Sequence, residues 1–443
     1  MNNQVWQVSI IIPVFNNWHL TRQCLESLRQ HTPGNLFEVL VVDNGSTDGT
    51  GTYGPSLGNS LFGPNFRHLR LKRNINFGPA CNLGAKESQA PLLFFLNNDT
   101  ILTPNWWPPL LAGLKAEAQV GAVGPLLLYP GSGPWKDRVQ HLGIAVEPQL
   151  YPVHLYEYFP HSHPLVRKKR YFQALTGAAL LLPKKIFLEF GGFFEGYING
   201  GEDVDLGCHL RQQGKLLSCV TESRIYHLVG QTPGRHLHEK HNGEVLKSRC
   251  LHLLIPDLHL FTAGDGYELR LSPWLRPYLI LPERRKKILE RQLQDPWDLA
   301  QCQLLLGKEP VWVEGYEKLA ASFEAENDFA GAVPWRFLQC HFLPHRQTFV
   351  KLLETARRAG DEDQMAFAQR RISLIDQVTV RRDFYETATF MLNYARQLQQ
   401  PALVGLYENW LEKTYPELNR FPESMVTAGM DIKLRENLGE VEG

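Results

Sequence analysis

Apolar residues in the first half of the chain fall into short continuous runs, and segments with a helical period separate these runs. The pattern predicts strands at 8–14, 39–42, 69–72 and 92–96, and helices at 18–30, 82–88, 183–189 and 203–213. Near-continuous apolar strands that alternate with helices are typical of βαβ units whose sheet is covered on both faces. The sequence therefore predicts an α/β domain with a mostly parallel sheet.

The pattern changes after residue 250. Segment 251–300 is rich in proline and ends in a basic helix at 283–291, so we expect a connector. From about residue 301 the chain is helical, and two turns 33 residues apart, at 327–329 and 360–362, each lie between paired amphipathic helices. This period resembles tetratricopeptide repeats, and an ordinary helical bundle is the alternative. We expect three parts: 1–250, 251–300 and 301–443.

Composition narrows the class of protein. The chain has 443 residues, 43% hydrophobic and 21% charged, with a formal net charge of zero, so nothing indicates a nucleic-acid partner. Its seven cysteines form no CxxC pair, which favours a reducing compartment over a disulfide framework. The N-terminus has no secretory pattern, and no apolar run approaches the roughly 20 residues of a membrane span. We therefore expect a cytoplasmic protein.

Carboxylates follow two of the predicted strands. Residues 39–42 lead into Asp43 and a Gly/Ser/Thr-rich loop, and residues 92–96 lead into Asn97, Asn98 and Asp99. Polar groups at the open end of an α/β sheet build phosphate and metal sites, and Asp99 suits a divalent ion, which prefers oxygen ligands. The alternative for both acids is a cap on the next helix or turn.

Two further positions carry candidate chemistry. The pair Glu202-Asp203 follows Gly200-Gly201, and adjacent acids point in different directions, so one is a candidate base; the alternative is an acidic first helical turn. His227 follows an apolar pair and is a candidate metal ligand, although lone histidines are more often structural. The cluster His236, His238, Glu239 and His241 is a weaker metal candidate, because no buried residues frame it.

Six stretches in this order resemble glycosyltransferase family 2, an inverting family with the GT-A fold. They are residues 9–17 (SIIIPVFNN), 41–50 (VVDNGSTDGT), 73–84 (RNINFGPACNLG), 94–100 (FFLNNDT), 176–179 (TGAA) and 191–206 (GGF through EDVDL). The resemblance covers about residues 8–230. It implies a GT-A mixed sheet flanked by helices, followed here by an all-α C-terminal domain.

The resemblance also implies roles for individual residues. Asp203 matches the catalytic base, with Glu202 beside it, and Asp99 and His227 match the ligands of a Mn²⁺ or Mg²⁺ ion on the donor diphosphate. The positions that match the donor site are Pro13, Phe15, Asn16, Asp43, Asn76, Gly78, Asn97 and Asn98. Asn97 departs from the family's DXD motif, because it places an amide where the first acid is usual; rhamnosyltransferase-like members have the same form.

The implied reaction is the inverting transfer of a sugar from a UDP- or dTDP-linked donor to a hydroxyl of a glycan, a lipid-linked saccharide or a protein. The alternative is a non-catalytic nucleotide-sugar-binding or scaffold protein that uses its helical domain to bind a protein partner. Arg284 to Lys287, beside Trp274, Tyr278 and Leu281, suggest peripheral contact with the inner face of a membrane. A solvated helix face is the other interpretation of that basic run.

Overall fold

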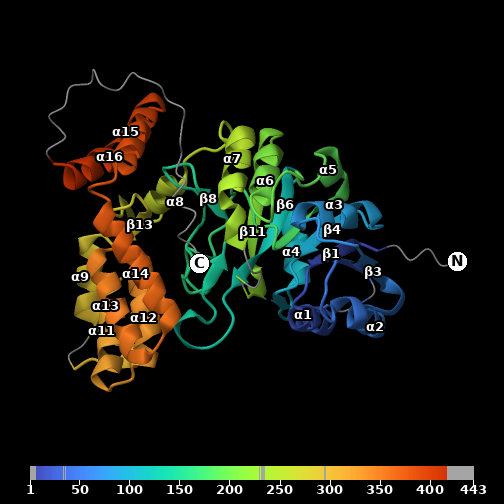
Figure 1. The fold of residues 1–443 in the computed structure, drawn as a ribbon, viewed down its shortest axis with the longest axis horizontal. Helices are drawn as coiled ribbons and strands as arrows, with labels where there is room; N and C mark the ends of the chain where they lie inside the picture. Colours follow the sequence, from blue (N-terminus) through green and yellow to red (C-terminus); the bar gives the residue numbers. More distant parts are fainter. Residues whose placement is uncertain are drawn as a thin grey trace. The chain divides into compact units, whose positions relative to one another are not determined.

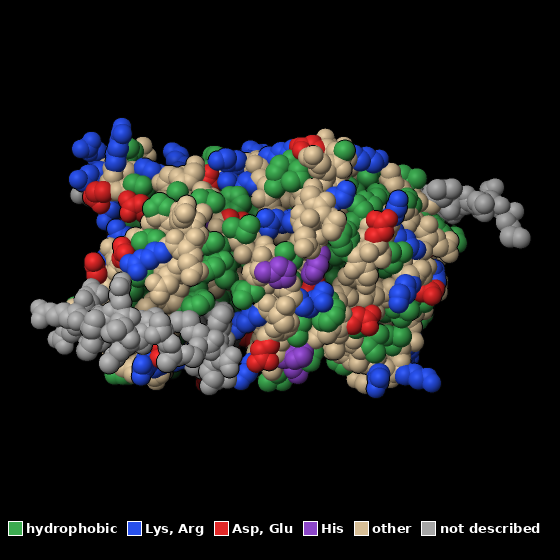
Figure 2. Space-filling model, turned by 90° about the horizontal axis from the view of Figure 1, so that it is seen from above, with side chains coloured by type: hydrophobic (Ala, Val, Ile, Leu, Met, Phe, Trp, Pro, Cys, Tyr) green, Lys and Arg blue, Asp and Glu red, His purple; other side chains and the backbone are tan. Residues whose placement is uncertain are grey.

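The computed structural model describes residues 6–32, 34, 36–228, 230, 235–293 and 296–416. The chain divides into two compact units, shown in Figure 1: an N-terminal unit of residues 1–146 and 152–255, and a C-terminal unit of residues 147–151 and 256–443. Each unit has its own buried hydrophobic cluster. On the face shown in Figure 2, lysines and arginines are interspersed with aspartates and glutamates, in keeping with the net charge of zero.

A nine-stranded sheet forms the centre of the N-terminal unit, with the order β3-β2-β1-β4-β10-β6-β11-β5 and β7 paired to β6. Its strands are β1 (Val8–Val14), β2 (Phe37–Asp43), β3 (Phe66–Arg70), β4 (Leu92–Leu96), β5 (Thr100–Leu102), β6 (Val120–Leu128), β7 (Val139–His141), β10 (Ala179–Pro183) and β11 (Leu216–His227). A separate hairpin joins β8 (Ile144–Val146) to β9 (Pro152–His154).

The strand directions place the polar loops. Strands β3, β2, β1 and β4 run parallel, so their carboxyl ends share one edge of the sheet. β10 is antiparallel to β4, with Ala179 opposite Leu96, so the start of β10 lies at that same edge. β5 pairs with β11 so that Thr100 lies opposite His227, which brings the far end of β11 to the segment after β4.

Helices cover both faces of this sheet. They are α1 (Trp18–His31), α2 (Thr50–Phe62), α3 (Phe77–Glu87), α4 (Trp107–Lys115), α5 (Lys184–Glu189), α6 (Glu202–Gln212) and α7 (Glu239–Cys250). Short 3-10 turns occupy Gly63–Asn65, Gly133–Trp135 and Arg235–His238. Alternate strand residues face opposite sides. Ile10 and Ile12 therefore join the cluster beneath α1, α2 and α4, whereas Ile11 faces Gly84 of α3.

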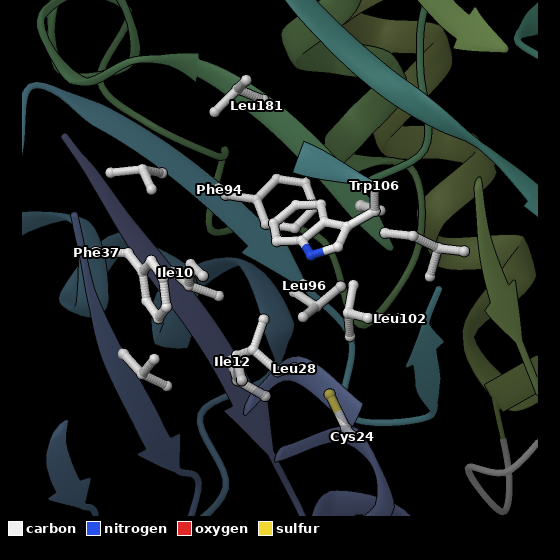
Figure 3. Close-up of a cluster of buried hydrophobic side chains, with 14 of the residues drawn as sticks. Ile10, Ile12, Cys24, Leu28, Phe37, Phe94, Leu96, Leu102, Trp106 and Leu181 are labelled. Carbon is white, nitrogen blue, oxygen red and sulfur yellow. The ribbon is translucent and has the colours of Figure 1, made fainter. Parts of the chain in front are cut away.

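Aromatic and aliphatic side chains fill this core, as Figure 3 shows. Phe94 stacks on Trp106 with ring centroids 5.0 Å apart, and both side chains are fully buried. The indole N–H of Trp106 donates to the Thr32 hydroxyl at 3.0 Å, so the one polar atom of this large side chain is satisfied. A rigid, dry core beneath β1, β2 and β4 fixes the positions of the loops that follow these strands.

The C-terminal unit begins with mixed structure and continues as helices. Its elements are α8 (Leu258–Gly264), β12 (Glu268–Leu271), β13 (Pro277–Ile280), α9 (Glu283–Gln292), α10 (Leu299–Lys308), α11 (Val313–Ala325), α12 (Phe329–Phe342), α13 (Arg346–Ala359), α14 (Glu362–Gln377), α15 (Arg382–Gln397) and α16 (Pro401–Thr414). The mixed sheet flanked by helices, with an all-helical region after residue 299, confirms the predicted fold class.

The segment expected to be a connector has internal contacts of its own. Trp274, Tyr278 and Leu281, which suggested membrane contact, are buried at 1%, 8% and 8% exposure. On α9, Arg285 pairs with Glu309, Lys286 with Glu314 and Lys287 with Glu283. Most of the basic run is thus matched by carboxylates of the same chain. Among the described residues, no helix is long and apolar enough to cross a bilayer.

Candidate active site

The loops after β1 and β2 are joined to each other by hydrogen bonds. Asn16 adopts the left-handed conformation (φ 58°), and its side-chain oxygen accepts from the Thr47 N–H at 2.8 Å. Its own N–H donates to the Ser46 hydroxyl at 2.9 Å. Pro13 is buried within β1, whereas Phe15, the next side chain on that face, is 40% exposed at the sheet edge. An exposed aromatic beside a rigid polar loop offers a surface on which a planar ring can stack.

Asp43 ends β2 and is completely buried. Its Oδ1 accepts from the Ser46 N–H at 2.8 Å. Its Oδ2 has no hydrogen-bond partner among the described residues, and lies 3.6 Å from Arg70 Nε and 4.0 Å from His68 Nε2. Burial, reinforced by Arg70, lowers the pKa of His68 despite the nearby carboxylate, so the imidazole is neutral near pH 7. Asp43 Oδ2 therefore has an ion-pair partner in Arg70 but accepts no hydrogen bond from the described residues.

Asn44 holds the segment before α3. Its side chain donates to Asn74 Oδ1 at 2.9 Å and to the Asn76 carbonyl at 3.1 Å, and it accepts from the Ile75 N–H at 2.8 Å. Gly45 (φ 79°) makes this approach possible, because a Cβ there would lie 2.7 Å from the Arg73 backbone. The positive φ and the close contact both require glycine.

The end of α3 nearest the site is tied to the loop that follows α5. The Phe77 N–H donates to Asn199 Oδ1 at 2.8 Å, and Asn82 exchanges hydrogen bonds with the Phe193 backbone at 2.8 and 2.9 Å. Gly78 is buried, and a Cβ there would meet Phe193 and Phe194 at ordinary contact distances. The predicted donor-site positions Asn76 and Gly78 thus lie where three loops are joined by hydrogen bonds.

The segment after β4 turns at the same edge. The Asn97 N–H donates to the Ala178 carbonyl at 2.8 Å, and Asn98 Nδ2 donates to the Thr21 hydroxyl at 2.9 Å. Asp99 follows, and its carbonyl accepts from the Leu228 N–H at 2.9 Å. These bonds anchor Asn97 and Asn98 to the sheet and to α1, and Asp99 to the segment that follows β11.

Asp99 and His227 come together in the structure. His227 Nε2 lies 3.2 Å from Asp99 Oδ1, and the two side chains are 6% and 13% exposed. The pairing of β5 with β11 produces this contact, because Thr100 and His227 are opposite each other. The two residues are 128 positions apart in the chain, and the sheet topology explains how they become neighbours.

The Asp99–His227 pair fits a divalent cation. Two ligand atoms at adjacent corners of an octahedron, each about 2.1 Å from the ion, are about 3 Å apart, and the measured separation is 3.2 Å. A carboxylate oxygen and an imidazole nitrogen are both accepted by Mn²⁺. Neither Asn97 nor Asn98 supplies a second carboxylate, so a phosphate donor and water would complete the ligand set.

The acidic pair begins α6. Gly201 precedes it in the left-handed conformation (φ 99°), and the buried Glu202 folds back to accept from the Gly200 N–H at 2.8 Å. Asp203 is partly exposed; its Oδ2 accepts from the Gly177 N–H at 2.8 Å and its Oδ1 from the Val204 N–H at 2.9 Å. The two acids therefore differ in role: Glu202 closes the turn, and Asp203 stays open to solvent in a fixed orientation.

Residues 176–178 connect Asp203 to the segment after β4. Gly177 donates to Asp203, and the neighbouring Ala178 accepts from Asn97. The Thr176 N–H donates to His141 Nε2 at 3.3 Å. Sequence reasoning found residues 176–179 as a motif without a role, and it missed Asn44, Gln140 and Asn199, which hold the site through side-chain amides. Asn44 and Asn199 gave only the signal of their position between predicted elements, and Gln140 lies on strand β7.

A second group has donor atoms suited to metals. Asp205, His209 and Cys250 offer ligand atoms within 4.8 Å of one another, the one such group of three found in the described part of the chain. The carboxylate of Asp205 is already engaged, because Arg249 donates to both its oxygens at 2.5 and 3.1 Å and Tyr197 donates to one at 2.9 Å. This carboxylate is charge-balanced by a guanidinium.

The other histidine candidates are used differently. His241 Nε2 contacts the Gly196 carbonyl at 2.9 Å, which ties α7 to the loop before α6. The side chain of His236 lies outside the described residues, and His238 is exposed. The described members of the cluster 236–241 do not form a group of three ligands.

Comparison with known proteins shows which family and which relatives this chain is similar to. Residues 9–187 match the family model described as Glycosyl transferase family 2. The chain is 32% identical over 227 residues to the O-antigen biosynthesis protein RfbC of Myxococcus xanthus, covering 50% of this chain and 17% of that protein. It is 27% identical over 279 residues to the N-acetylglucosaminyl-diphospho-decaprenol L-rhamnosyltransferase of Mycobacterium tuberculosis, covering 58% and 87%.

Two of the relatives are much longer than the region that they share with this chain. The chain spans 17% of the Myxococcus protein and 24% of the uncharacterized protein y4gI of Sinorhizobium fredii. Among solved structures, GalNAc-T7 with UDP, GalNAc and Mn²⁺ shares 19% identity at a TM-score of 0.43, over 51% of this chain and 44% of that chain. A TM-score of 0.43 indicates only a loose similarity between the two structures. Five of the six ordered motifs fall within the matched region, and the sixth follows it, so residues 9–187 are similar to a glycosyl transferase family 2 domain.

Proposed function

We propose that this chain is a glycosyltransferase that moves a sugar from a nucleoside-diphosphate sugar to an acceptor hydroxyl. One observation carries the proposal beyond the family match. The partly exposed carboxylate of Asp203 is bonded to residue 177, the next residue accepts from Asn97, and Asp99 meets His227 two positions later. A candidate base and a candidate diphosphate site therefore share one edge of the sheet.

The donor nucleotide would occupy the loops after β1 and β2. Asp43 Oδ2 is buried and accepts no hydrogen bond from the described residues, Phe15 exposes a ring, and Asn16 and Asn76 hold the loops in place. A carboxylate oxygen that can still accept a hydrogen bond suits the imide N–H of a uracil or thymine ring, so a UDP- or dTDP-linked donor is proposed. Arg70 would have to move aside, since its guanidinium lies over that oxygen. Pro13, Gly78, Asn97 and Asn98 complete the proposed donor surface.

Transfer would proceed by a single displacement with inversion. The acceptor oxygen attacks the anomeric carbon, its proton passes to Asp203, and the bond from that carbon to the diphosphate oxygen breaks with both electrons leaving on the diphosphate. The Gly177 and Val204 N–H groups orient the carboxylate and keep it from rotating. A base placed in this way contributes roughly 10²- to 10⁴-fold. Glu202, occupied by the Gly200 N–H, supports the turn.

Asp99 and His227 would hold a divalent cation, Mn²⁺ or Mg²⁺, which when bound supplies positive charge to the departing diphosphate. The low exposure of both side chains keeps water away from their ligand atoms, and this strengthens their interaction with a cation. Because Asn97 contributes no charge, the site relies on one carboxylate and one neutral imidazole. We therefore expect weaker metal binding than two carboxylates would give.

The acceptor is proposed to be a glycan or lipid-linked saccharide, with a protein acceptor as a further option. The names of the Myxococcus and Mycobacterium relatives refer to O-antigen biosynthesis and to a diphospho-decaprenol acceptor. In the C-terminal unit, the hairpins α11–α12, α13–α14 and α15–α16 begin at Val313, Arg346 and Arg382, 33 and then 36 residues apart. We propose that this tetratricopeptide-like array binds a protein partner.

The test uses purified full-length protein with a panel of UDP-, dTDP- and GDP-linked sugars, each with Mn²⁺, with Mg²⁺ or with excess EDTA. Mass spectrometry would detect release of the nucleoside diphosphate and transfer to short-chain polyprenyl-diphosphate saccharides. We expect turnover with a UDP- or dTDP-linked donor and little with EDTA. Full activity in EDTA would refute the metal role, and no product from any donor would refute the transferase proposal.

A further inference from the structure

Gln140 is a buried polar side chain next to the candidate metal ligand. It lies on β7, is 6% exposed, and its Oε1 is 3.3 Å from His227 Nδ1. The sheet creates this contact, because β7 and β11 both pair with the end of β6: Val139 and Tyr226 are each opposite Leu128. Gln140 belongs to none of the stretches that carry the family resemblance.

The two ring nitrogens of His227 face different groups. Nε2 faces Asp99 Oδ1 at 3.2 Å, and Nδ1 faces Gln140 Oε1 at 3.3 Å. Among the described residues, these two groups lie within 3.3 Å of the ring nitrogens. Nε2 can offer a lone pair to a cation only if the proton of the neutral ring is on Nδ1. An acceptor at Nδ1 holds the proton there, and an amide oxygen is such an acceptor.

The contact also fixes the plane of the ring. An imidazole held only at Nε2 can rotate about χ2, whereas a hydrogen bond at Nδ1 defines its orientation. Such hydrogen bonds to the second nitrogen of a ligating histidine are worth about 10- to 100-fold in metal affinity. Gln140 is uncharged, so it orients the ring without adding a negative charge to a site that already holds Asp99.

We infer that Gln140 is a positioning residue for His227, and that it holds the imidazole with its Nε2 lone pair directed to the space shared with Asp99. This inference rests on the proposed function, because it assigns the Asp99–His227 pair to a divalent cation. It predicts that a residue outside the family motifs controls how tightly the site binds Mn²⁺.

The test measures Mn²⁺ affinity of the full chain by electron paramagnetic resonance of the free ion, without donor or acceptor. Gln140→Met keeps the length of the side chain and removes the acceptor, and we expect about 10- to 100-fold weaker binding. Gln140→Glu keeps an acceptor oxygen, so binding should be at least as tight as in the natural protein. Gln149→Met is the matched control, since Gln149 is a buried glutamine of the C-terminal unit that donates to the Leu275 carbonyl.

A double-mutant cycle separates positioning from a general structural effect. In His227→Ala the ring is absent, so adding Gln140→Met should weaken Mn²⁺ binding no further. If Gln140→Met does not fold, Gln140→Asn replaces it, because the shorter side chain withdraws the oxygen but stays polar. Unchanged affinity in these variants, or additive losses with His227→Ala, would overturn the inference.

The inference and the proposed function fail separately. If the natural protein transfers sugar and Gln140→Met binds Mn²⁺ normally, Gln140 has no positioning role and the transferase proposal stands. If no donor gives product but Gln140→Met weakens Mn²⁺ binding through His227, the positioning role stands and the transferase proposal falls. A natural protein that binds no Mn²⁺ overturns the inference outright.

Discussion

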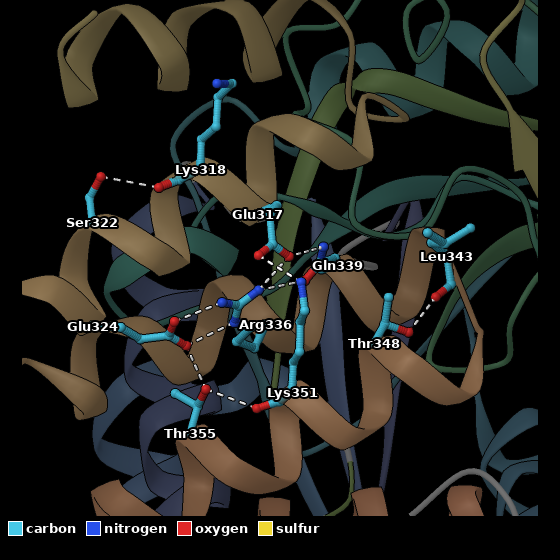
Figure 4. Close-up of polar contacts among 10 residues, drawn as sticks. All are labelled: Glu317, Lys318, Ser322, Glu324, Arg336, Gln339, Leu343, Thr348, Lys351 and Thr355. Atoms are coloured by element: carbon cyan, nitrogen blue, oxygen red, sulfur yellow. Dashed lines mark hydrogen bonds and ion pairs between the residues drawn. The ribbon is translucent and has the colours of Figure 1, made fainter.

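The Arg336 network of the C-terminal unit and Asp203 of the N-terminal unit hold their charges in different ways. In the C-terminal unit, Arg336 of α12 is 3% exposed, yet it donates to Glu317 and to both oxygens of Glu324, as Figure 4 shows. Lys351 and Thr355 complete the same network. In the N-terminal unit, Asp203 is held only by backbone N–H groups and remains partly exposed. A buried ion pair is costly to break, because removing one partner leaves the other charge uncompensated, whereas a partly exposed carboxylate held by the backbone stays available for chemistry.

A substitution of Asp203 gives the most direct test of the difference between this carboxylate and the Arg336 network. Asp203→Asn keeps an oxygen for the Gly177 N–H but removes the base, so we expect a transfer rate lower by about 10²- to 10⁴-fold. The free energy of unfolding should change by less than about 1 kcal/mol. Initial rates and urea unfolding measure these two properties, and nucleotide binding shows whether the donor still binds. Asp383→Asn, at an exposed carboxylate paired with Arg381, is the control. Normal turnover in Asp203→Asn would refute the base assignment.

The closed network should behave in the reverse way. Arg336→Met leaves Glu317 and Glu324 without their guanidinium, and losing one partner of a buried ion pair costs about 3–5 kcal/mol. Urea unfolding followed by circular dichroism would measure the loss. Arg346→Met, which breaks the exposed pair with Asp376, should have a much smaller effect. Equal losses in the two variants would mean that burial of Arg336 gives the network no special weight.

Gly45 tests how the loop after β2, part of the proposed donor site, is built. Gly45→Ala puts a Cβ 2.7 Å from the Arg73 backbone at a positive φ, whereas Gly214→Ala meets a positive φ of 72° with open space around it. We expect Gly45→Ala to cost about 1–3 kcal/mol and Gly214→Ala about 1 kcal/mol. Gly45→Ala should also weaken UDP binding, which calorimetry can measure. Equal effects on both properties would show that the contact with Arg73 is not needed.

The smallest effect concerns pH. Burial alone would raise the pKa of Glu317, but hydrogen bonds from Lys351, Gln339 and Arg336 lower it to about 2. A lowered pKa in the folded state means that the stabilisation is present above the ordinary value of 4.5 and is lost as the pH falls from there toward 2. The free energy of unfolding of the natural protein should thus fall more steeply between pH 5 and pH 3 than that of Glu317→Gln. Parallel curves would contradict this assignment.

Local patterns predicted several elements of the N-terminal unit, because buried strands and amphipathic helices leave periodic signals. They missed α2 and α4, and the strand expected at 69–72 lies earlier, at Phe66–Arg70. The run 92–96 coincides with β4, the helix expected at 18–30 is Trp18–His31, and that expected at 203–213 is Glu202–Gln212. The helix expected at 82–88 begins earlier, at Phe77, because Gly78 and Pro79 occupy its first turn, where their low propensity is tolerated.

Tertiary contacts set the limit of sequence reasoning. The proximity of Asp99 to His227 depends on an antiparallel pairing of distant segments, which no local pattern encodes. Gln140 was missed for the same reason: a glutamine between Val139 and His141 carries no local sign of a site. In segment 251–300 the frequent prolines suggested irregular chain, whereas Pro277 begins β13 and Trp274 is buried in the cluster with Phe349. Proline is compatible with the start of a strand.

The tripeptide 176–178 affects how precisely the candidate base and the candidate metal site are spaced. Its successive backbone groups contact His141, Asp203 and Asn97. The candidate base and Asn97, which lies beside the candidate metal site, are therefore held by the same short segment. Thermal displacement of that segment moves both reference points together, and the shared motion cancels from their separation. A site built in this way tolerates drift of the surrounding loops, while the separation between the candidate base and the candidate metal site varies little.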